Sequence, residues 1–230
     1  MKTIGLIGGM SWESTRIYYE AVNVDVRARL GGLHSAQCIL HSLDFAPIAE
    51  MQAAGRWEEA GQALADAARA LERAGAEVLG LCTNTMHKVA DQITAATSIP
   101  FVHIADATAG ALRGAGRRAP YLMATRFTME QDFYVRRLQT HGFDVVVPEP
   151  ADRVEIHRII YEELCLGETK PSSRAAYEAM TAKARRAGAD SVLLGCTEVG
   201  MLLSDRNSAL PTFDTTLIHA RALVDFALQE

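Results

Sequence analysis

The sequence predicts an α/β protein with two similar Rossmann-like lobes, each built on a parallel sheet. We expect a pseudo-two-fold axis to relate the lobes and the active site to lie in the cleft between them. Short apolar runs alternate with amphipathic segments along the 230 residues, a pattern typical of parallel strands covered by helices. In addition, residues 74–83 (AGAEVLGLCT) match residues 187–196 (AGADSVLLGC) without a gap, so Thr83 and Cys196 occupy equivalent positions.

The individual elements follow from local periodicity, taken in chain order. In the N-terminal half, short apolar runs predict strands at residues 3–7, 38–43, 78–81 and 100–104, and apolar residues at helical spacing predict helices at 14–30 and 56–73. The C-terminal half continues the alternation, with strands at 121–124, 144–147, 191–194 and 210–213 and helices at 129–141, 152–166 and 172–186.

Shorter echoes of the repeat favour two halves of similar structure. Residues 99–103 (IPFVH) resemble 210–214 (LPTFD), and residues 6–10 (LIGGM) resemble 122–126 (LMATR). A chance repeat is the alternative, because Ala-Gly-Ala before a buried strand is common in α/β proteins. We place the first lobe at residues 1–103, joined by the C-terminal segment 212–230, and the second lobe at residues 104–211.

Composition narrows the class of partner. With 49% hydrophobic and 22% charged residues the chain can bury a core, and its net charge of −5 gives no footprint for nucleic acid beyond the short basic stretch at 113–118. The apolar run before Gly8 is too short for a signal peptide or a membrane span. We therefore expect a cytoplasmic protein with a small-molecule partner and no contact with nucleic acid or membrane.

The four cysteines indicate thiol chemistry. They lie far apart, at Cys38, Cys82, Cys165 and Cys196, with no CxxC or Cys/His ligand spacing. This spacing argues against a zinc site and against a disulfide framework. No metal is expected, and a functional cysteine would act as a thiol.

Polar residues follow two of the predicted buried strands. Ligands of open parallel sheets bind beyond the carboxyl ends of strands, where loops lead into helix N-termini. Residues 81–87 (LCTNTMH) and 194–198 (LGCTE) fall at such ends, and their hydroxyl and backbone N–H groups could bind a carboxylate. The alternative is structural: Asn84 and Thr197 would cap helices, and Cys196 would be a small buried apolar residue.

These motifs resemble those of the aspartate/glutamate racemase family, whose members need no pyridoxal phosphate. The resemblance covers almost the whole chain and rests on residues 4–15 (IGLIGGMSWEST), 83–87 (TNTMH), 195–198 (GCTE) and 211–215 (PTFDT). The family pattern normally reads Cys-Asn-Thr-x-His in the first half, and Thr83 stands here at the place of that cysteine. Cys82, one residue earlier, is expected on the other face of the strand.

The chain thus looks like the Thr/Cys branch, similar to bacterial broad-specificity and L-aspartate/glutamate-specific racemases. The resemblance implies a homodimer without a cofactor that acts on a small amino acid, with Thr83 and Cys196 as catalytic residues. Met10 and Ser11 are placed after the first strand to offer backbone N–H groups to a carboxylate, although a glycine turn that merely packs is an equally ordinary use. The expected substrate-binding residues are Met10, Ser11, Gln52, Asn84, Thr85, Thr125, Thr128 and Thr197.

Inversion of an α-carbon without a cofactor needs a base on one face and an acid on the other. A thiol has an ordinary pKa of about 8.5, which a helix N-terminus or neighbouring donors can lower, so we expect a thiolate fraction at Cys196 near neutral pH. A threonine hydroxyl is a much poorer acid and base, so the two directions should be unequal. His87 could polarise Thr83 or simply pack, and Glu198 could deprotonate Cys196 or favour a helix N-terminus.

The substrate and the reaction have alternatives. Known aspartate racemases carry an arginine and a lysine for the side-chain carboxylate, and residues 44–52 and 163–167 show no clear equivalents, which raises a neutral amino acid such as homoserine. An arylmalonate decarboxylase or maleate isomerase activity is a second enzymatic reading. A protein that binds an amino acid without transforming it is a third. Nucleotide binding is disfavoured because Gly8 and Gly9 lack the GxGxxG spacing.

Overall fold

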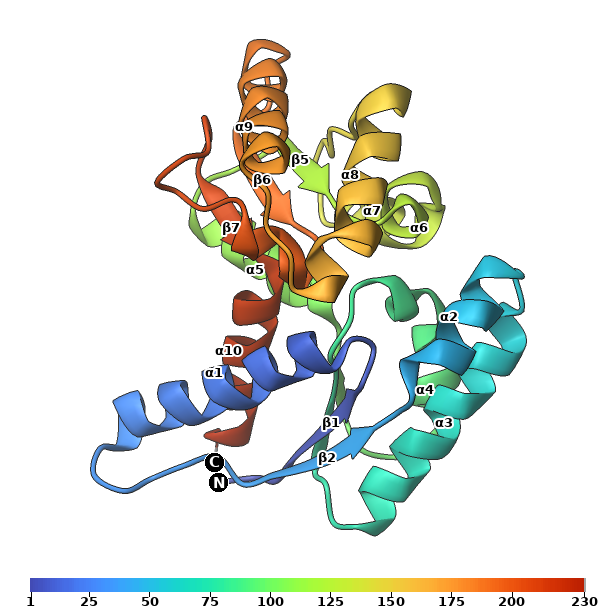
Figure 1. Ribbon diagram of the computed structural model, residues 1–230. Helices are drawn as coiled ribbons and strands as arrows, with labels where there is room; N and C mark the ends of the chain where they lie inside the picture. The colour runs from blue at the N-terminus through green and yellow to red at the C-terminus, as the bar shows by residue number, and fades with distance from the viewer. Residues whose placement is uncertain (230) are drawn as a thin grey trace. The chain divides into compact units, whose positions relative to one another are not determined.

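The computed structural model describes residues 1–229, which form two compact units. The first unit contains Met1–Ile104 and the C-terminal residues from His219 onward, and the second contains Ala105–Ile218. Each unit carries its own parallel sheet flanked by helices (Figure 1). The predicted class, a two-lobed α/β protein with parallel sheets, is confirmed.

The first unit has a four-stranded sheet in the order β2-β1-β3-β4, with all neighbours parallel. Its strands are β1 (Ile4–Gly8), β2 (Cys38–Ser42), β3 (Val78–Leu81) and β4 (Phe101–Val102). The helices that accompany them are α1 (Trp12–Leu30), α2 (Phe45–Ala53), α3 (Trp57–Arg73), the 3₁₀ helix η1 (Thr85–Val89), α4 (Ala90–Ala96) and the C-terminal α10 (Thr215–Ala227).

Side-chain alternation along β1 separates two apolar cores. Ile4 and Leu6 lie in a cluster with residues of α1 and α10, whereas Ile7 lies in a second cluster with residues of α2, α3 and α4. The sheet is therefore the middle layer of three, as Figure 1 shows for α1 on one side and α3 on the other. Fully buried Cys82 belongs to the core under α1 and α10.

The second unit has a three-stranded parallel sheet in the order β5-β6-β7. The strands are β5 (Pro120–Met123), β6 (Ser191–Leu194) and β7 (Thr212–Asp214). The helices are α5 (Ile104–Gly114), α6 (Arg126–Glu130), α7 (Asp132–Thr140), α8 (Pro150–Glu162), η2 (Leu164–Leu166), α9 (Pro171–Arg186) and η3 (Thr197–Met201).

The predicted lobe boundary at residue 212 was wrong. β7 pairs with β6, with Phe213 opposite Leu193, so residues 212–218 belong to the second unit. The chain joins the first unit only from His219, which lies within α10. Hydrogen bonding of the strand to its neighbour, which apolar periodicity does not reveal, decides the boundary.

Two elements of the second unit also differ from the prediction. Residues 144–147 contribute a single bridge rather than a strand: Val146 exchanges backbone hydrogen bonds with Pro120 and Leu122 of β5, and Pro148 then offers no N–H group to extend the pairing. The predicted helix 129–141 is broken at Gln131, whose extended backbone separates α6 from α7.

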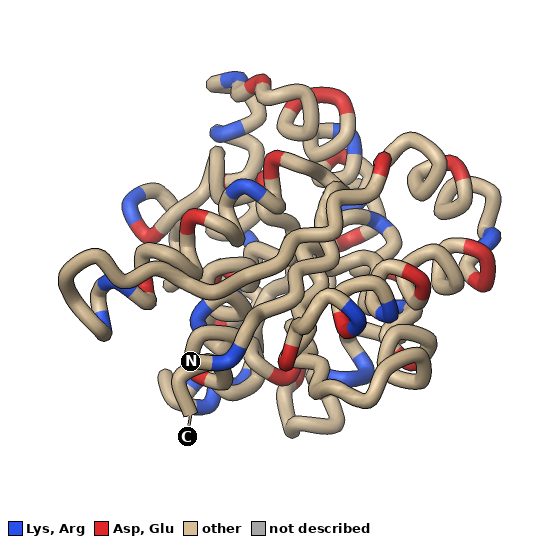
Figure 2. Tube along the Cα trace, turned by 90° about the horizontal axis from the view of Figure 1, so that it is seen from below, with Lys and Arg blue, Asp and Glu red and all other residues tan. Residues whose placement is uncertain are grey.

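Charged residues of both signs alternate along the chain, and Figure 2 shows no long stretch of either colour on the backbone trace. Within residues 1–229, none of the helices combines the length and the apolar character that crossing a bilayer would require.

Candidate active site

The predicted site residues fall into two groups, one in each unit. The first unit holds Met10, Ser11, Gln52, Thr83, Asn84, Thr85 and His87, and the second holds Thr125, Thr128, Cys196, Thr197 and Glu198. In the first unit, the adjacent strands β1 and β3 lead into Met10 and Thr83 respectively. In the second, the adjacent strands β5 and β6 lead into Thr125 and Cys196. Each group thus lies where the carboxyl ends of neighbouring parallel strands place ligand sites.

A tight turn connects β1 to α1 and fixes Ser11. The backbone N–H of Gly9 donates to Thr15 Oγ1 at 2.8 Å, and the Thr15 hydroxyl donates to the Ser11 carbonyl at 2.9 Å. Ser11 Oγ accepts a hydrogen bond from Ser14 N at 3.2 Å and so caps α1. The Ser11 hydroxyl therefore caps α1. Backbone N–H groups of this turn are then the more suitable donors for a substrate carboxylate.

Gln52 of α2 reaches the same region of the first unit. Its Nε2 donates to Met86 Sδ at 3.0 Å, which ties α2 to η1. Gln52, Asn84 and Thr85 are all buried, with about 5% of their surface exposed. Burial of amide and hydroxyl groups is unfavourable unless they form hydrogen bonds, so these three side chains are suited to a polar site and not to an apolar core.

His87 contacts backbone groups through both ring nitrogens. Nδ1 lies 2.7 Å from the Thr83 carbonyl oxygen, and Nε2 lies 3.2 Å from the amide nitrogen of Ile104. Because a carbonyl only accepts and an amide N–H only donates, Nδ1 carries the hydrogen and Nε2 is the acceptor. His87 is therefore a neutral imidazole that holds the backbone at Thr83 against the start of α5.

In the second unit, threonine hydroxyls line the strand ends. Thr125 caps α6 by accepting from Thr128 N at 3.4 Å, and the hydroxyls of the two residues lie 3.2 Å apart. Thr197 Oγ1 lies 2.9 Å from Thr216 Oγ1. The residue before Cys196 is a glycine, Gly195, and a Cβ at this position would lie only 2.8 Å from Leu122 and 2.9 Å from Ala124.

Cys196 is a half-buried thiol beside a carboxylate. Its Sγ donates to Glu198 Oε2 at 2.9 Å. Burial raises the pKa of Cys196 well above its usual value, and the negative charges of Glu198 and Cys165 raise it further. This direction is opposite to the expected lowering, because the neighbouring acidic groups disfavour the thiolate and η3 is a short 3₁₀ turn. Burial and the neighbouring charges thus both favour the protonated thiol.

Three residues near Cys196 were not predicted as site residues from the sequence: Arg126, Tyr161 and Cys165. The pKa of Tyr161 is raised by burial and by the charges of Cys196, Cys165 and Glu198, whereas Arg126 opposes the rise, so these groups lie within electrostatic range of the Tyr161 hydroxyl. Two signals could have revealed them. Arg126 directly follows Thr125 at a strand end, and Tyr161 and Cys165 are spaced four residues apart near the end of a predicted helix.

Known proteins of similar sequence and structure agree in one family. Residues 7–223 match the model of the Asp/Glu/hydantoin racemase family. The broad-specificity amino-acid racemase RacX of Bacillus subtilis (strain 168) is 23% identical over 225 residues, covering 96% of each chain.

Two solved structures are similar over the full length of both chains. A Yersinia pestis protein described as a candidate Asp/Glu racemase is 52% identical, with a TM-score of 0.94. An aspartate racemase homologue from Pyrococcus horikoshii OT3 is 34% identical, with a TM-score of 0.88. With its strand-end polar groups and a family match that spans both units, this chain belongs to the Asp/Glu/hydantoin racemase family of isomerases.

Proposed function

We propose that the chain is a cofactor-independent amino-acid racemase in which Cys196 and Thr83 exchange protons with opposite faces of the substrate α-carbon. The observation that carries this proposal is the thiol of Cys196 at 2.9 Å from Glu198, at the carboxyl end of β6. A half-buried thiol that is hydrogen-bonded to a carboxylate can pass its proton over that one bond, as general acid–base catalysis requires. Family membership and the similarity to RacX support racemisation as the reaction.

The proton path begins with a charge change at Cys196. The thiol stays protonated while Glu198 and burial disfavour its thiolate. A bound substrate brings an ammonium group, whose positive charge favours the thiolate, and Glu198 Oε2 can then accept the thiol hydrogen. The thiolate removes the α-proton of the L-enantiomer, and the resulting carbanion takes a proton from the Thr83 hydroxyl on the other face.

The Thr83 side is the weaker partner. A hydroxyl is a poor acid, so the alkoxide formed at Thr83 must recover a proton from water before the next turnover, and protonated Glu198 must release to water the proton that it took from Cys196. His87 contributes as a positioning residue, because its Nδ1–H bond to the Thr83 carbonyl fixes the backbone that carries the hydroxyl. We therefore assign slow exchange to the Thr83 face and fast exchange to the Cys196 face.

The substrate is a small amino acid with a polar side chain, either aspartate or glutamate or a neutral residue such as homoserine. Arg126 favours the acidic candidates. Its exposed guanidinium lies 5.9 Å from the Phe127 ring, beside the group that surrounds Tyr161 and Cys196. If Arg126 receives a side-chain carboxylate, Arg126→Gln raises KM for aspartate or glutamate much more than KM for homoserine.

A chiral assay of L- and D-amino acids without added cofactor tests the proposal. We expect interconversion by the intact protein, loss of activity in Cys196→Ser, and retained activity in the matched control Cys82→Ala, since Cys82 lies in the core. Release of carbon dioxide from malonates without racemisation would instead identify a decarboxylase. Unchanged amino-acid affinity in Cys196→Ser, with no turnover by either protein, would identify a binding protein.

We also propose that the enzyme works as a cytoplasmic homodimer. Light scattering of the purified chain measures its mass directly, and a monomeric mass at the concentrations used for activity would contradict the dimer.

A further inference from the structure

The second unit has a cavity of about 250 Å³ that no part of the racemase chemistry uses. It is lined by Arg113, Arg117, Arg118 and His141, together with Gly116, Gly142 and Phe143. We call it the arginine cavity. It lies at the amino end of β5, after α5 and beside the turn that follows α7. The four-residue strand β5 separates it from Thr125 by roughly 13 Å, so it is distinct from the strand-end site.

The guanidinium groups of the arginine cavity form no close ion pairs with neighbouring side chains. Among the described residues, no carboxylate lies within 4.0 Å of the guanidinium of Arg113, Arg117 or Arg118. The nearby carboxylates bond elsewhere. Asp190 accepts from the amides of Arg118 and Ala119 at 2.6 and 3.1 Å and from Ser191 Oγ at 2.8 Å.

The other nearby acid is also engaged. Asp106 holds Arg137 through two bonds of 2.7 Å and lies 2.9 Å from His141 Nε2. These acids bond mainly to the walls of the arginine cavity, and Asp190 attracts Arg117 without forming a salt bridge with it. One such carboxylate does not balance three arginines, so an anion in the cavity would be attracted.

Arg117 carries a buried donor without an acceptor. Within residues 1–229, its Nε has no hydrogen-bond partner, and its terminal nitrogen donates one long hydrogen bond, of 3.4 Å, to the Asp190 carbonyl. Arg113 similarly lies 3.5 Å from the His141 carbonyl. Buried guanidinium donors normally find partners, because leaving one unpaired is unfavourable. Because a guanidinium has five N–H donors, Arg113 and Arg117 keep donors for an oxyanion beyond these single long hydrogen bonds.

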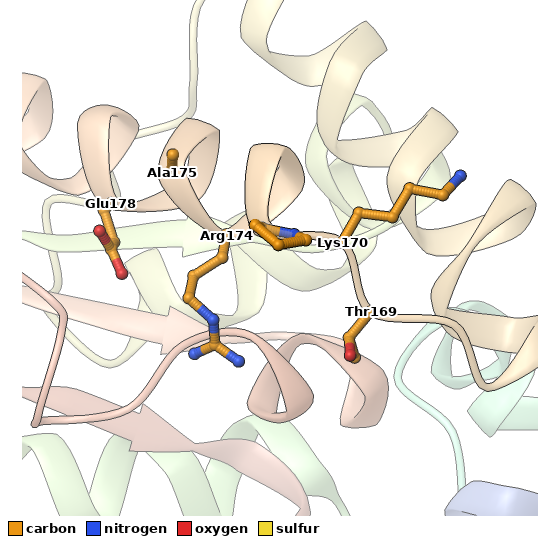
Figure 3. A pocket seen from close by; sticks show the side chains of 6 residues that line it. Thr169, Lys170, Arg174, Ala175 and Glu178 are labelled. Carbon is orange, nitrogen blue, oxygen red and sulfur yellow. The ribbon is translucent and has the colours of Figure 1, made fainter.

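A second cavity provides a contrast. Figure 3 shows Lys170 and Arg174 pointing in different directions from the start of α9. Arg174 donates to the Leu202 carbonyl at 2.7 Å, and Lys170 lies 3.6 Å from Glu163. These cations are satisfied by the protein itself, so two basic residues beside a cavity do not make an anion site there.

We propose that the arginine cavity binds a small phosphate-bearing anion, either inorganic phosphate or a phosphate monoester. Guanidinium groups match the oxygen geometry of phosphate, and three of them favour a dianion over a single carboxylate. The cavity is smaller than the roughly 300–1,000 Å³ typical of pockets for drug-sized ligands, which suits an anion of this size. The site is independent of the proposed racemase activity, because its ligand binds at the other end of β5.

Calorimetric titration of the full chain at constant ionic strength tests this site, with inorganic phosphate, glycerol 3-phosphate and malonate as probes. We expect saturable binding of a phosphate probe and a loss of affinity of about tenfold or more in Arg113→Gln/Arg117→Gln. The matched control Arg136→Gln removes an exposed arginine of α7 that pairs with Asp132, and should bind as the intact protein does.

The arms of the titration separate the sources of phosphate. Tighter binding of glycerol 3-phosphate indicates a monoester ligand, and binding of inorganic phosphate alone indicates the free anion. Arg117→Lys keeps the charge but removes the Nε donor, so we expect an intermediate loss of phosphate affinity. If the double variant fails to fold, the single variant Arg113→Gln replaces it, because Arg113 is exposed. No saturable phosphate binding, equal malonate binding, or equal losses in Arg136→Gln would each overturn the proposal.

Discussion

Cys196 donates its thiol hydrogen to Glu198 over 2.9 Å, and burial and the Glu198 charge both raise its pKa. In the proposed mechanism, these surroundings keep the Cys196 thiol poorly reactive until a positive charge arrives, which protects it from alkylation and oxidation between turnovers. Glu198 thereby has two opposing effects. Its charge disfavours the thiolate, while its oxygen provides the place where the thiol proton can go.

Glu198→Gln separates these two effects. Removing the negative charge lowers the pKa of Cys196, so the thiolate fraction at pH 7 rises, by about tenfold for each unit of pKa. We expect faster alkylation of Cys196 by iodoacetamide in Glu198→Gln, together with slower racemisation because the proton acceptor is lost. Mass spectrometry of the Cys196 peptide over a pH series measures the alkylation rate.

Cys38 provides an internal control in the same digest. It lies in β2 of the first unit, and burial alone raises its pKa, so its alkylation rate should not change in Glu198→Gln. Slower alkylation of Cys196 in this variant would contradict the electrostatic argument and would identify Glu198 as the base that creates the thiolate in the free enzyme.

At the scale of elements, the turn between β1 and α1 depends on Gly9. Its φ of 94° lies in the left-handed region, and a Cβ there would collide with the backbone of Leu43. Gly188 is a matched control, because it has a φ of 96° and no atom within 4 Å of the added Cβ.

We expect Gly188→Ala to lower the free energy of unfolding by about 1–2 kcal/mol, the cost of a left-handed alanine, and Gly9→Ala to lower it by more. Gly9→Ala should also raise KM, because the displaced backbone carries Met10 and Ser11. Urea denaturation and steady-state kinetics of both variants measure these effects. Equal destabilisation would show that the backbone of Leu43 moves away at little cost.

Sequence periodicity predicted the elements whose apolar pattern is unambiguous. β3 and β6 were located at 78–81 and 191–194, and α3 and α9 began within one residue of the predicted positions. The helices that periodicity missed are of two kinds. α2 and α4 are short, with nine and seven residues, and α5 and α10 begin within two residues of short strands, so the preceding apolar residues hid them.

The sequence predicted that the candidate site residues lie at strand ends, but it did not predict their electrostatics. Strand ends located Thr83 and Cys196, because parallel strands direct their carboxyl ends toward ligand sites. The direction of the Cys196 pKa shift required the neighbours of the thiol in space, and Cys165 lies far from it in sequence. Likewise the hydrogen bonds of His87 go to backbone groups, which a residue spacing cannot distinguish from a bond to the Thr83 hydroxyl.

At the scale of the whole molecule, buried His219 couples the C-terminal helix to the sheet of the first unit. Its Nε2 donates to the Val102 carbonyl at 2.8 Å, and its Nδ1 accepts from the Tyr18 hydroxyl at 2.8 Å. Burial lowers the pKa of His219 to about 4. The imidazole is therefore neutral in the folded protein at any pH near neutrality.

This depressed pKa predicts a loss of stability in acid. The unfolded histidine binds a proton near pH 6.5 while the folded one does not, so stability is complete above pH 6.5 and falls as the pH drops toward 4, by about 3 kcal/mol. Urea denaturation followed by tryptophan fluorescence reports on the first unit, which contains both Trp12 and Trp57. His219→Gln should show a flatter pH dependence over this window. If the free energy of unfolding of His219→Gln fell with pH as steeply as that of the unmodified protein, groups other than His219 would be responsible for the loss of stability in acid.

The two directions of the proposed reaction should differ in rate but not in end point. Free enantiomers have equal energy, so the overall equilibrium constant of racemisation is one whichever groups carry the protons. The exchange rates need not be equal, because a thiol faces one side of the α-carbon in the proposed mechanism and a threonine hydroxyl the other. In deuterated water we expect much faster exchange of the α-hydrogen of the L-enantiomer, which meets Cys196, than of the D-enantiomer, which meets Thr83.

Thr83→Cys tests the cause of this asymmetry. A second thiol should raise exchange of the D-enantiomer, because a thiol is a far better proton carrier than a hydroxyl near neutral pH. Chiral chromatography coupled to mass spectrometry measures both rates and the end point in one experiment. Since the hydrogen bonds of His87 hold the backbone rather than the side chain of residue 83, the substitution should leave them in place. Equal rates for both enantiomers in the unmodified enzyme would mean that a bound water or another group serves the Thr83 face as well as a thiol does.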